Sequence, residues 1–103
     1  MHTVVESDTF QRLWPLYWTE DERGAFASFL ASHPDAGDVI VGTGGLRKVR
    51  WSRAGSGKRG GVRVIYFSRN AAGELVLLTI YSKTTADTIS AKQLLEIKHA
   101  NSI

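Results

Sequence analysis

Apolar side chains in the first part of the chain recur at the spacing of a helix. A short run at residues 3–6 predicts a first strand. Four apolar residues then fall at i, i+3, i+4 and i+7: Phe10, Leu13, Trp14 and Tyr17. Ser7 or Asp8 is expected to cap this helix, since short polar side chains accept hydrogen bonds from the first turn. Pro15 should kink or shorten it, because proline has no amide hydrogen to donate.

A second helix is predicted directly after the first. Thr19 and Glu22 have the spacing of a capping box. The apolar face that follows consists of Phe26, Phe29 and Leu30. His33 precedes a proline, and that position disfavours the α conformation, so the helix should end there. The two helices are expected to form a hairpin whose aromatic residues pack on a sheet.

The middle of the chain alternates as strands do. Residues 46–53, 62–69 and 75–81 predict three strands, preceded by a glycine-rich turn at 38–45. In the first strand, one face carries Arg47, Val49, Trp51 and Arg53, and the other carries Leu46, Lys48, Arg50 and Ser52. In the second strand, Arg63 shares a face with Ile65 and Phe67.

The order of the predicted elements indicates an α+β fold. A capping box at Ser90 and Gln93 begins a C-terminal helix. Short links between the strands favour a largely antiparallel sheet, with an N-terminal helical hairpin and a C-terminal helix on one side of it. The length of 103 residues fits a single domain spanning residues 1–103.

Composition limits both the cellular compartment that we expect and the kinds of metal site that the chain can form. The chain has no cysteine, which excludes disulfides and cysteine-based zinc sites. The first residues lack the pattern of a signal peptide, and the longest apolar stretch, residues 75–80, is too short to span a bilayer. We therefore expect a cytoplasmic protein without membrane association.

Charge is distributed unevenly along the chain. Residues 1–38 contain seven acids and two bases. Residues 39–73 contain no acid and eight bases: Arg47, Lys48, Arg50, Arg53, Lys58, Arg59, Arg63 and Arg69. A surface of one sign attracts polyanions, so this segment predicts a nucleic-acid contact. The alternative is a charged strand pair that keeps the sheet soluble.

No familiar cofactor or metal motif fits. Residues 55–60 match a dinucleotide-binding glycine pattern, but they join two predicted strands and do not begin a helix. A phosphate-binding P-loop fails because Ser52 and Arg59 stand where glycine and serine or threonine are required. The three histidines lie far apart in sequence. We expect no cofactor and no metal.

Cationic side chains without histidine or metal can still cleave RNA. The 2′-hydroxyl of RNA attacks the adjacent phosphate, and the protein must orient this geometry, stabilise the phosphorane and move protons. Arginine suits the phosphorane because its planar fork donates two hydrogen bonds at once. Trp51, Tyr66 and Tyr81 could stack on bases, with ordinary strand packing as the alternative.

Three strand segments resemble the RelE/HigB family of type II toxins, and in particular its HigB branch. They read GTGGLRKVRW, GKRGGVRVIYF and LLTIYSK. The resemblance implies a RelE-like fold and a ribosome-dependent endonuclease that cuts messenger RNA. It also implies a cognate antitoxin, a small helix-turn-helix protein encoded next to the toxin, whose complex alone would contact operator DNA.

By position, the resemblance assigns roles to individual residues. Arg63 corresponds to the arginine at the scissile phosphate, and the catalytic set also includes Lys58 and Lys83. The expected RNA-binding residues are Arg47, Lys48, Arg50, Arg59, Trp51 and Tyr81. No tyrosine follows Tyr81, where the family has a C-terminal catalytic tyrosine, so the proton-transfer roles stay open.

The sequence leaves open two alternatives to the endonuclease function and one alternative role for Arg63. The chain could block translation by binding RNA or the ribosome without cutting, or it could bind an acidic protein partner through its basic face. Arg63 could also pair with Glu96 to hold the C-terminal helix.

Overall fold

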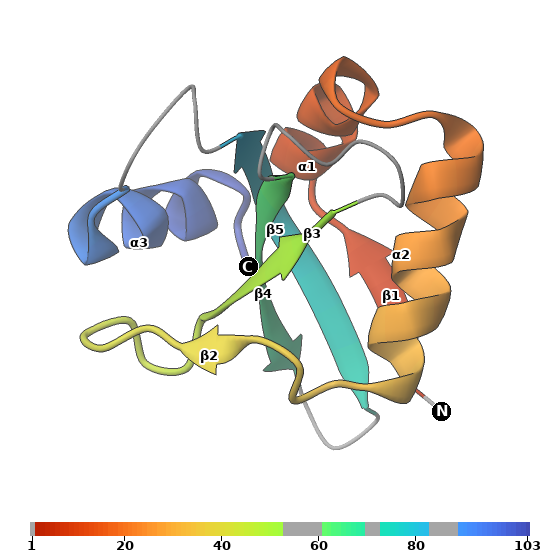
Figure 1. Ribbon diagram of the computed structural model, residues 1–103. Helices are drawn as coiled ribbons and strands as arrows, with labels where there is room; N and C mark the ends of the chain where they lie inside the picture. Colours follow the sequence, from red (N-terminus) through yellow and green to blue (C-terminus); the bar gives the residue numbers. More distant parts are fainter. Residues whose placement is uncertain (1, 53–60, 70–72, 83–88) are drawn as a thin grey trace.

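The computed structural model describes residues 2–52, 61–69, 73–82 and 89–103. The described residues form a five-stranded sheet in the order β1-β5-β4-β3-β2, flanked by helices (Figure 1). The elements in chain order are β1 (Thr3–Glu6), α1 (Asp8–Leu13), the 3-10 helix η1 (Trp14–Leu16), α2 (Glu20–Ser32), β2 (Asp38–Val39), β3 (Arg47–Trp51), β4 (Val62–Arg69), β5 (Glu74–Ser82) and α3 (Ala91–Ala100). β1 runs parallel to β5, and the other pairings are antiparallel.

The predicted helix starts and stops are confirmed. Ser7 caps α1 by accepting a hydrogen bond from the Phe10 amide at 3.1 Å. Pro15 lies in η1, so the α-helix ends at Leu13. Thr19 and Ser90 each form a complete capping box with the residue three positions later. Local sequence chemistry therefore sets these boundaries.

The prediction that all helices lie on one side of the sheet is wrong. α1 and α2 cover one face, and α3 lies on the other (Figure 1). We call these the hairpin face and the α3 face. The helices divide between the two faces because β4 and β5 are apolar on both sides. In β5, for example, the consecutive residues Leu77 and Leu78 are buried toward opposite faces. A strand buried on both faces needs a cover on each side.

The two-residue strand β2 was not predicted from the sequence, because residues 38–45 were expected to form a turn.

A bulge in β5 changes the face of the residues that follow it. Ile65 pairs with Thr79 and Tyr66 pairs with Leu77, so Leu78 has no partner on β4. An extra residue of this kind reverses the alternation of side chains beyond it. As a result Ile80 packs on the hairpin face, and Tyr81 joins Phe67 and Leu78 on the α3 face.

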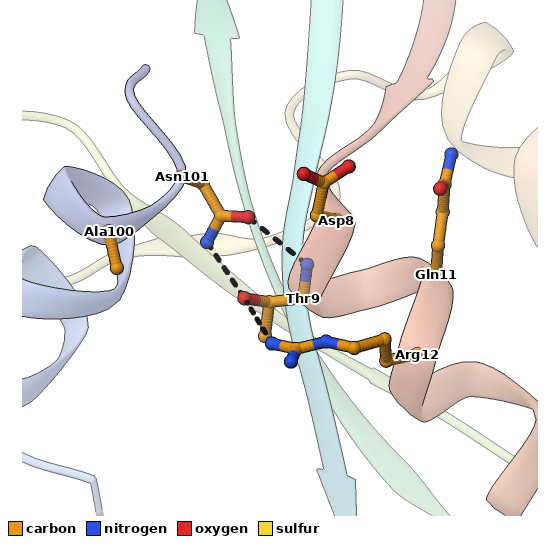
Figure 2. A pocket seen from close by; sticks show the side chains of 6 residues that line it. All are labelled: Asp8, Thr9, Gln11, Arg12, Ala100 and Asn101. Atoms are coloured by element: carbon orange, nitrogen blue, oxygen red, sulfur yellow. Dashed lines mark hydrogen bonds between the residues drawn. The ribbon is translucent and has the colours of Figure 1, made fainter.

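The end of α3 is attached to the start of α1 through Asn101 (Figure 2). The Asn101 side chain accepts a hydrogen bond from the Thr9 amide at 3.1 Å and donates one to Thr9 Oγ1 at 2.8 Å. It also donates to the Ile97 carbonyl at 2.8 Å. Ninety-two residues separate the partners in sequence, so this contact holds α3 in place relative to the hairpin.

Asn101→Ala is expected to lower the free energy of unfolding by roughly 1–2 kcal/mol, because it leaves the Thr9 amide without its partner and removes one of the two donors to the Thr9 hydroxyl. Hydrogen exchange of the α3 amides should accelerate more than that of α2. Gln11→Ala is the control, since Gln11 is exposed on the same helix as Thr9 with its side chain pointing away from Asn101 (Figure 2), and its loss should change stability by less than about 0.5 kcal/mol. Equal effects of the two substitutions would contradict the assigned attachment.

None of the helices in the described part of the chain is long and apolar enough to cross a bilayer.

Candidate nucleic-acid interface

Three neighbouring strands bring two arginines and a tyrosine into one row on the α3 face. Arg50 on β3 pairs with Arg63 on β4, and Arg63 pairs with Tyr81 on β5. Directly paired residues point to the same side of a sheet, with Cβ atoms about 4.5–5.5 Å apart. Lys48 lies on the same face two residues before Arg50 and is exposed. We call Arg50, Arg63 and Tyr81 the cationic row.

Tyr81 is the buried end of the cationic row. Only 7% of the residue is exposed, and it packs in the cluster that contains Leu94 of α3. Burial raises the pKa of the Tyr81 phenol, while the positive charge of Arg63 acts to lower it. The tyrosine therefore stays protonated near neutral pH, and the charge of Arg63 is close enough to be felt at its ring.

Arg63 is half-buried, whereas Arg50 is exposed. Its strand neighbours on the same face, Ile65 and Phe67, are buried. The prediction that Arg63 shares a face with these two residues is confirmed. Apolar neighbours along the strand restrict a long side chain, so the guanidinium of Arg63 lies at the border between the core and the surface.

Two of the expected RNA-binding residues lie on the opposite face of β3 and make contacts within the fold. Arg47 donates a hydrogen bond to the Gly37 carbonyl at 2.7 Å, and it lies 3.4 Å from the Asp35 carboxylate. Trp51 packs against Phe26 and Phe29 of α2, with ring centroids 5.3 and 5.0 Å apart. The structure does not bring Arg47 and Trp51 to the cationic row.

Tyr66 also has a role within the fold. Its hydroxyl accepts a hydrogen bond from the Gly37 amide at 2.9 Å and donates one to the Pro34 carbonyl at 2.8 Å. Burial raises the pKa of Tyr66, so the hydroxyl keeps the proton that this second bond requires. A Cβ at Gly37 would lie 2.8 Å from the Tyr66 ring, so only glycine fits against it. The loop between α2 and β2 is thereby fastened to β4.

Three predicted site residues lie outside the described part of the chain: Lys58, Arg59 and Lys83. Arg53 of the basic segment lies there too. Their roles stay predictions from sequence.

The cationic row has a cost in stability that can be measured. Arg50 and Arg63 are directly opposite each other, and like charges in that arrangement destabilise a sheet. Arg50→Thr is therefore expected to raise the free energy of unfolding by about 0.2–1 kcal/mol, with the gain shrinking in high salt as the repulsion is screened.

Lys48→Thr is the matched control, because Lys48 lies opposite Ile65 on β4 and Asp38 on β2. The Lys48→Thr substitution should leave the free energy of unfolding unchanged or lower it slightly. Denaturant unfolding of both variants at low and high salt makes the comparison. An Arg50→Thr effect without salt dependence would show that repulsion is not its cause.

Among the described residues, no three histidine, aspartate or glutamate side chains gather as metal ligands would. What the row offers is cationic hydrogen-bond donors. Two neighbouring guanidinium groups can each donate paired hydrogen bonds to phosphate oxygens, and Lys48 adds a flexible charge beside them. This arrangement suits a phosphodiester backbone lying across β3 and β4.

No family model matches the sequence. A solved structure of the E. coli toxin RelE, with two arginines replaced by alanine and in the free state, superposes with a TM-score of 0.61. The match covers 98% of this chain and 94% of that chain, at 8% sequence identity. The chain has a RelE-like fold. The predicted fold class is therefore confirmed over almost the whole length, while assignment to the HigB branch stays a prediction.

Proposed function

We propose that this protein is the toxin of a type II toxin–antitoxin pair and acts as a ribosome-dependent endonuclease on messenger RNA. The observation that supports this proposal most is the cationic row, which lies on the α3 face of a RelE-like sheet. Lys48 extends the row along β3. The protein would act in the cytoplasm, where ribosomes and messenger RNA are its partners.

The proposed reaction is an internal displacement at phosphorus. The 2′-oxygen forms a bond to phosphorus, the bond to the 5′-oxygen breaks, and the products are a 2′,3′-cyclic phosphate and a free 5′-hydroxyl. One proton leaves the 2′-hydroxyl, and one is added to the departing 5′-oxygen. No electrons are transferred and no external reactant is consumed.

Arg63 is the residue we place at the phosphorane. Arg63 lies between Arg50 and Tyr81 in the sheet and is half-buried, so we expect its donors to need little reorganisation while negative charge develops. Arg50 and Lys48 hold the adjoining backbone phosphates. We assign proton transfer to Lys58 and Lys83, since a lysine placed among other cations can have a lowered pKa and so act as base or acid. Arg59 would contact the backbone beside them.

The proposed antitoxin is a small helix-turn-helix protein encoded next to the toxin. It would neutralise the cationic row by covering it with acidic side chains or by displacing a neighbouring element. Binding to operator DNA would then belong to the complex. Membership of the HigB branch is part of the same proposal and is supported by the segments GTGGLRKVRW and GKRGGVRVIYF.

Mapping of messenger ends after induction in a bacterial host tests the proposed function. We expect growth to stop within minutes and new 5′-hydroxyl ends to appear inside translated messages, at positions in register with the reading frame. Ends that persist after ribosomes are blocked from initiating would contradict ribosome dependence. Arrest of translation without any new ends would instead support a binding protein that inhibits by occupancy.

A further inference from the structure

Tyr81 lies in the cationic row only because β5 contains a bulge. If the register of residues 74–77 with β4 continued along β5, Ile80 would lie opposite Arg63. The extra residue, Leu78, shifts this register, so that Tyr81 lies opposite Arg63 instead. Bulges are frequent beside active sites, where they change the direction of a side chain. The bulge therefore exchanges an isoleucine for a tyrosine beside the arginine that we place at the phosphorane.

The burial of Tyr81 fits neither base stacking nor proton transfer. Only 7% of the residue is exposed, and it packs in the cluster that contains Leu94 of α3. A base stacks on an exposed ring, and little of this ring is open to one. Burial also raises the pKa of the phenol above its ordinary value, which suits proton transfer near neutral pH poorly. What Tyr81 offers to the site is its ring as a fixed surface.

Arg63 has a neighbour of the cationic row on each side of it. Arg50 on β3 and Tyr81 on β5 are both paired with it directly. Paired residues have Cβ atoms about 4.5–5.5 Å apart, so a tyrosine at that place is within reach of an arginine side chain. The positive charge of Arg63 also acts to lower the pKa of the Tyr81 phenol, as expected for groups this close. The ring of Tyr81 is therefore a near neighbour of the Arg63 side chain.

These two neighbours limit the directions that the Arg63 guanidinium can take. A long side chain loses much conformational entropy when it is held in one orientation, so an arginine needs neighbours that restrict it. Arg50 repels Arg63 from the β3 side, because both side chains are cations. Tyr81 occupies the β5 side. The direction that remains is outward from the sheet, where a phosphate on the α3 face would lie.

We propose that Tyr81 is a positioning residue for Arg63. Its ring, held in the core together with Leu94, keeps the guanidinium directed at the scissile phosphate. The role in cleavage rests on the proposed function of this protein, whereas the restriction of the Arg63 side chain does not. One measurement on the free protein and one on the reaction therefore separate the two.

The measurement on the free protein is NMR relaxation of the Arg63 Nε–Hε group, with Arg63→Lys to identify its signal. We expect the order parameter of this group to exceed that of Arg50, which is exposed on the same face. Tyr81→Leu removes the ring and should lower the Arg63 value to the level of Arg50. Because the first comparison uses the wild-type protein, it decides the proposal even where a variant does not fold.

The measurement on the reaction is single-turnover cleavage of messenger on the ribosome. Tyr81→Leu should reduce the rate at saturating ribosomes roughly 10- to 100-fold, the scale for a small misplacement of a reacting group. The affinity for ribosomes should stay within about twofold, because the ring is not expected to touch RNA. Tyr81→Phe keeps the ring, so it should recover most of the lost rate together with the order parameter of Arg63.

Phe67→Leu is the matched control for the loss of an aromatic ring. Phe67 has the same exposure of 7% and lies in the same cluster as Tyr81. It is four residues from Arg63 along β4, which places it roughly 13 Å away. The substitution should change the cleavage rate less than about threefold, since it leaves the neighbours of Arg63 in place. Equilibrium unfolding of each variant measures the accompanying loss of stability.

Several outcomes would overturn the proposal. Equal losses of cleavage rate for Tyr81→Leu and Phe67→Leu would mean that Tyr81 serves only the core. Tyr81→Phe as slow as Tyr81→Leu would assign the effect to the hydroxyl. An Arg63 order parameter no higher than that of Arg50 would show that the side chain is not restricted. If the wild type cuts no messenger, the proposed function fails, and the order parameter alone decides whether Tyr81 positions Arg63.

Discussion

Replacing Arg63 with alanine is expected to reduce single-turnover cleavage of messenger on the ribosome by roughly 10²-fold or more. This is the scale for removing one donor that stabilises developing charge. Arg63 lies between Arg50 and Tyr81 in the cationic row, and its half-buried position restricts the guanidinium. A donor fixed before the reaction stabilises the phosphorane more than the ground state, so the rate falls more than the affinity for ribosomes.

Arg12→Ala is the matched control for this experiment. It removes the same side chain from an exposed position on α1, away from the α3 face, and should leave cleavage within about twofold. Equilibrium unfolding of both variants shows whether the fold is retained. If Arg63→Ala loses stability but cleaves at a near-normal rate while folded, the residue serves the fold and its catalytic assignment is wrong.

Phe26→Ala is expected to lower the free energy of unfolding by about 3–5 kcal/mol, the range for removing a buried aromatic side chain. Phe26 has no exposed surface, and its ring contacts Trp18 and Trp51 at centroid distances of 5.1 and 5.3 Å. The substitution would leave a cavity where α2 meets the hairpin face of β3. Because a small domain is stable by only about 5–15 kcal/mol, this loss is a large fraction of the total, and the denaturant midpoint of unfolding should fall strongly.

Phe29→Ala provides the comparison on the same helix. Phe29 is half-buried and stacks on His33, with ring centroids 4.7 Å apart, as well as contacting Trp51. Its loss should cost about half as much or less, since solvent already reaches part of the ring. Denaturant unfolding followed by tryptophan fluorescence measures both. Equal losses of stability for the two variants would mean that the half-buried Phe29 holds α2 on the sheet as strongly as the buried Phe26 does.

Much of the secondary structure could be predicted from residues close together in sequence. Ser7, Thr19 and Ser90 start helices through hydrogen bonds within the first turn, and Pro15 interrupts one through its own ring. The bounds of β4 follow from its β-branched and aromatic residues. These features depend on interactions over a few residues, so the rest of the molecule is not needed to predict them.

The membership of the candidate site required longer-range information. Eight bases in residues 39–73 were evident from sequence, and alternation separated Lys48 and Arg50 from Arg47. Sequence did not show that Arg47 is held by Gly37 and Asp35, because these residues are ten or more positions away. Alternation alone would also have placed Tyr81 with Leu75 and Leu77, on the hairpin face.

The order and type of every element except β2, and the concentration of positive charge on the middle strands, therefore follow from local sequence alone. The tertiary structure decided that α3 covers the face opposite the hairpin, because β4 and β5 are apolar on both sides. It also decided that Tyr81 joins Arg63, through the bulge at Leu78. Both outcomes depend on how strands far apart in sequence pair and pack, and such contacts are selected by the burial of the whole core.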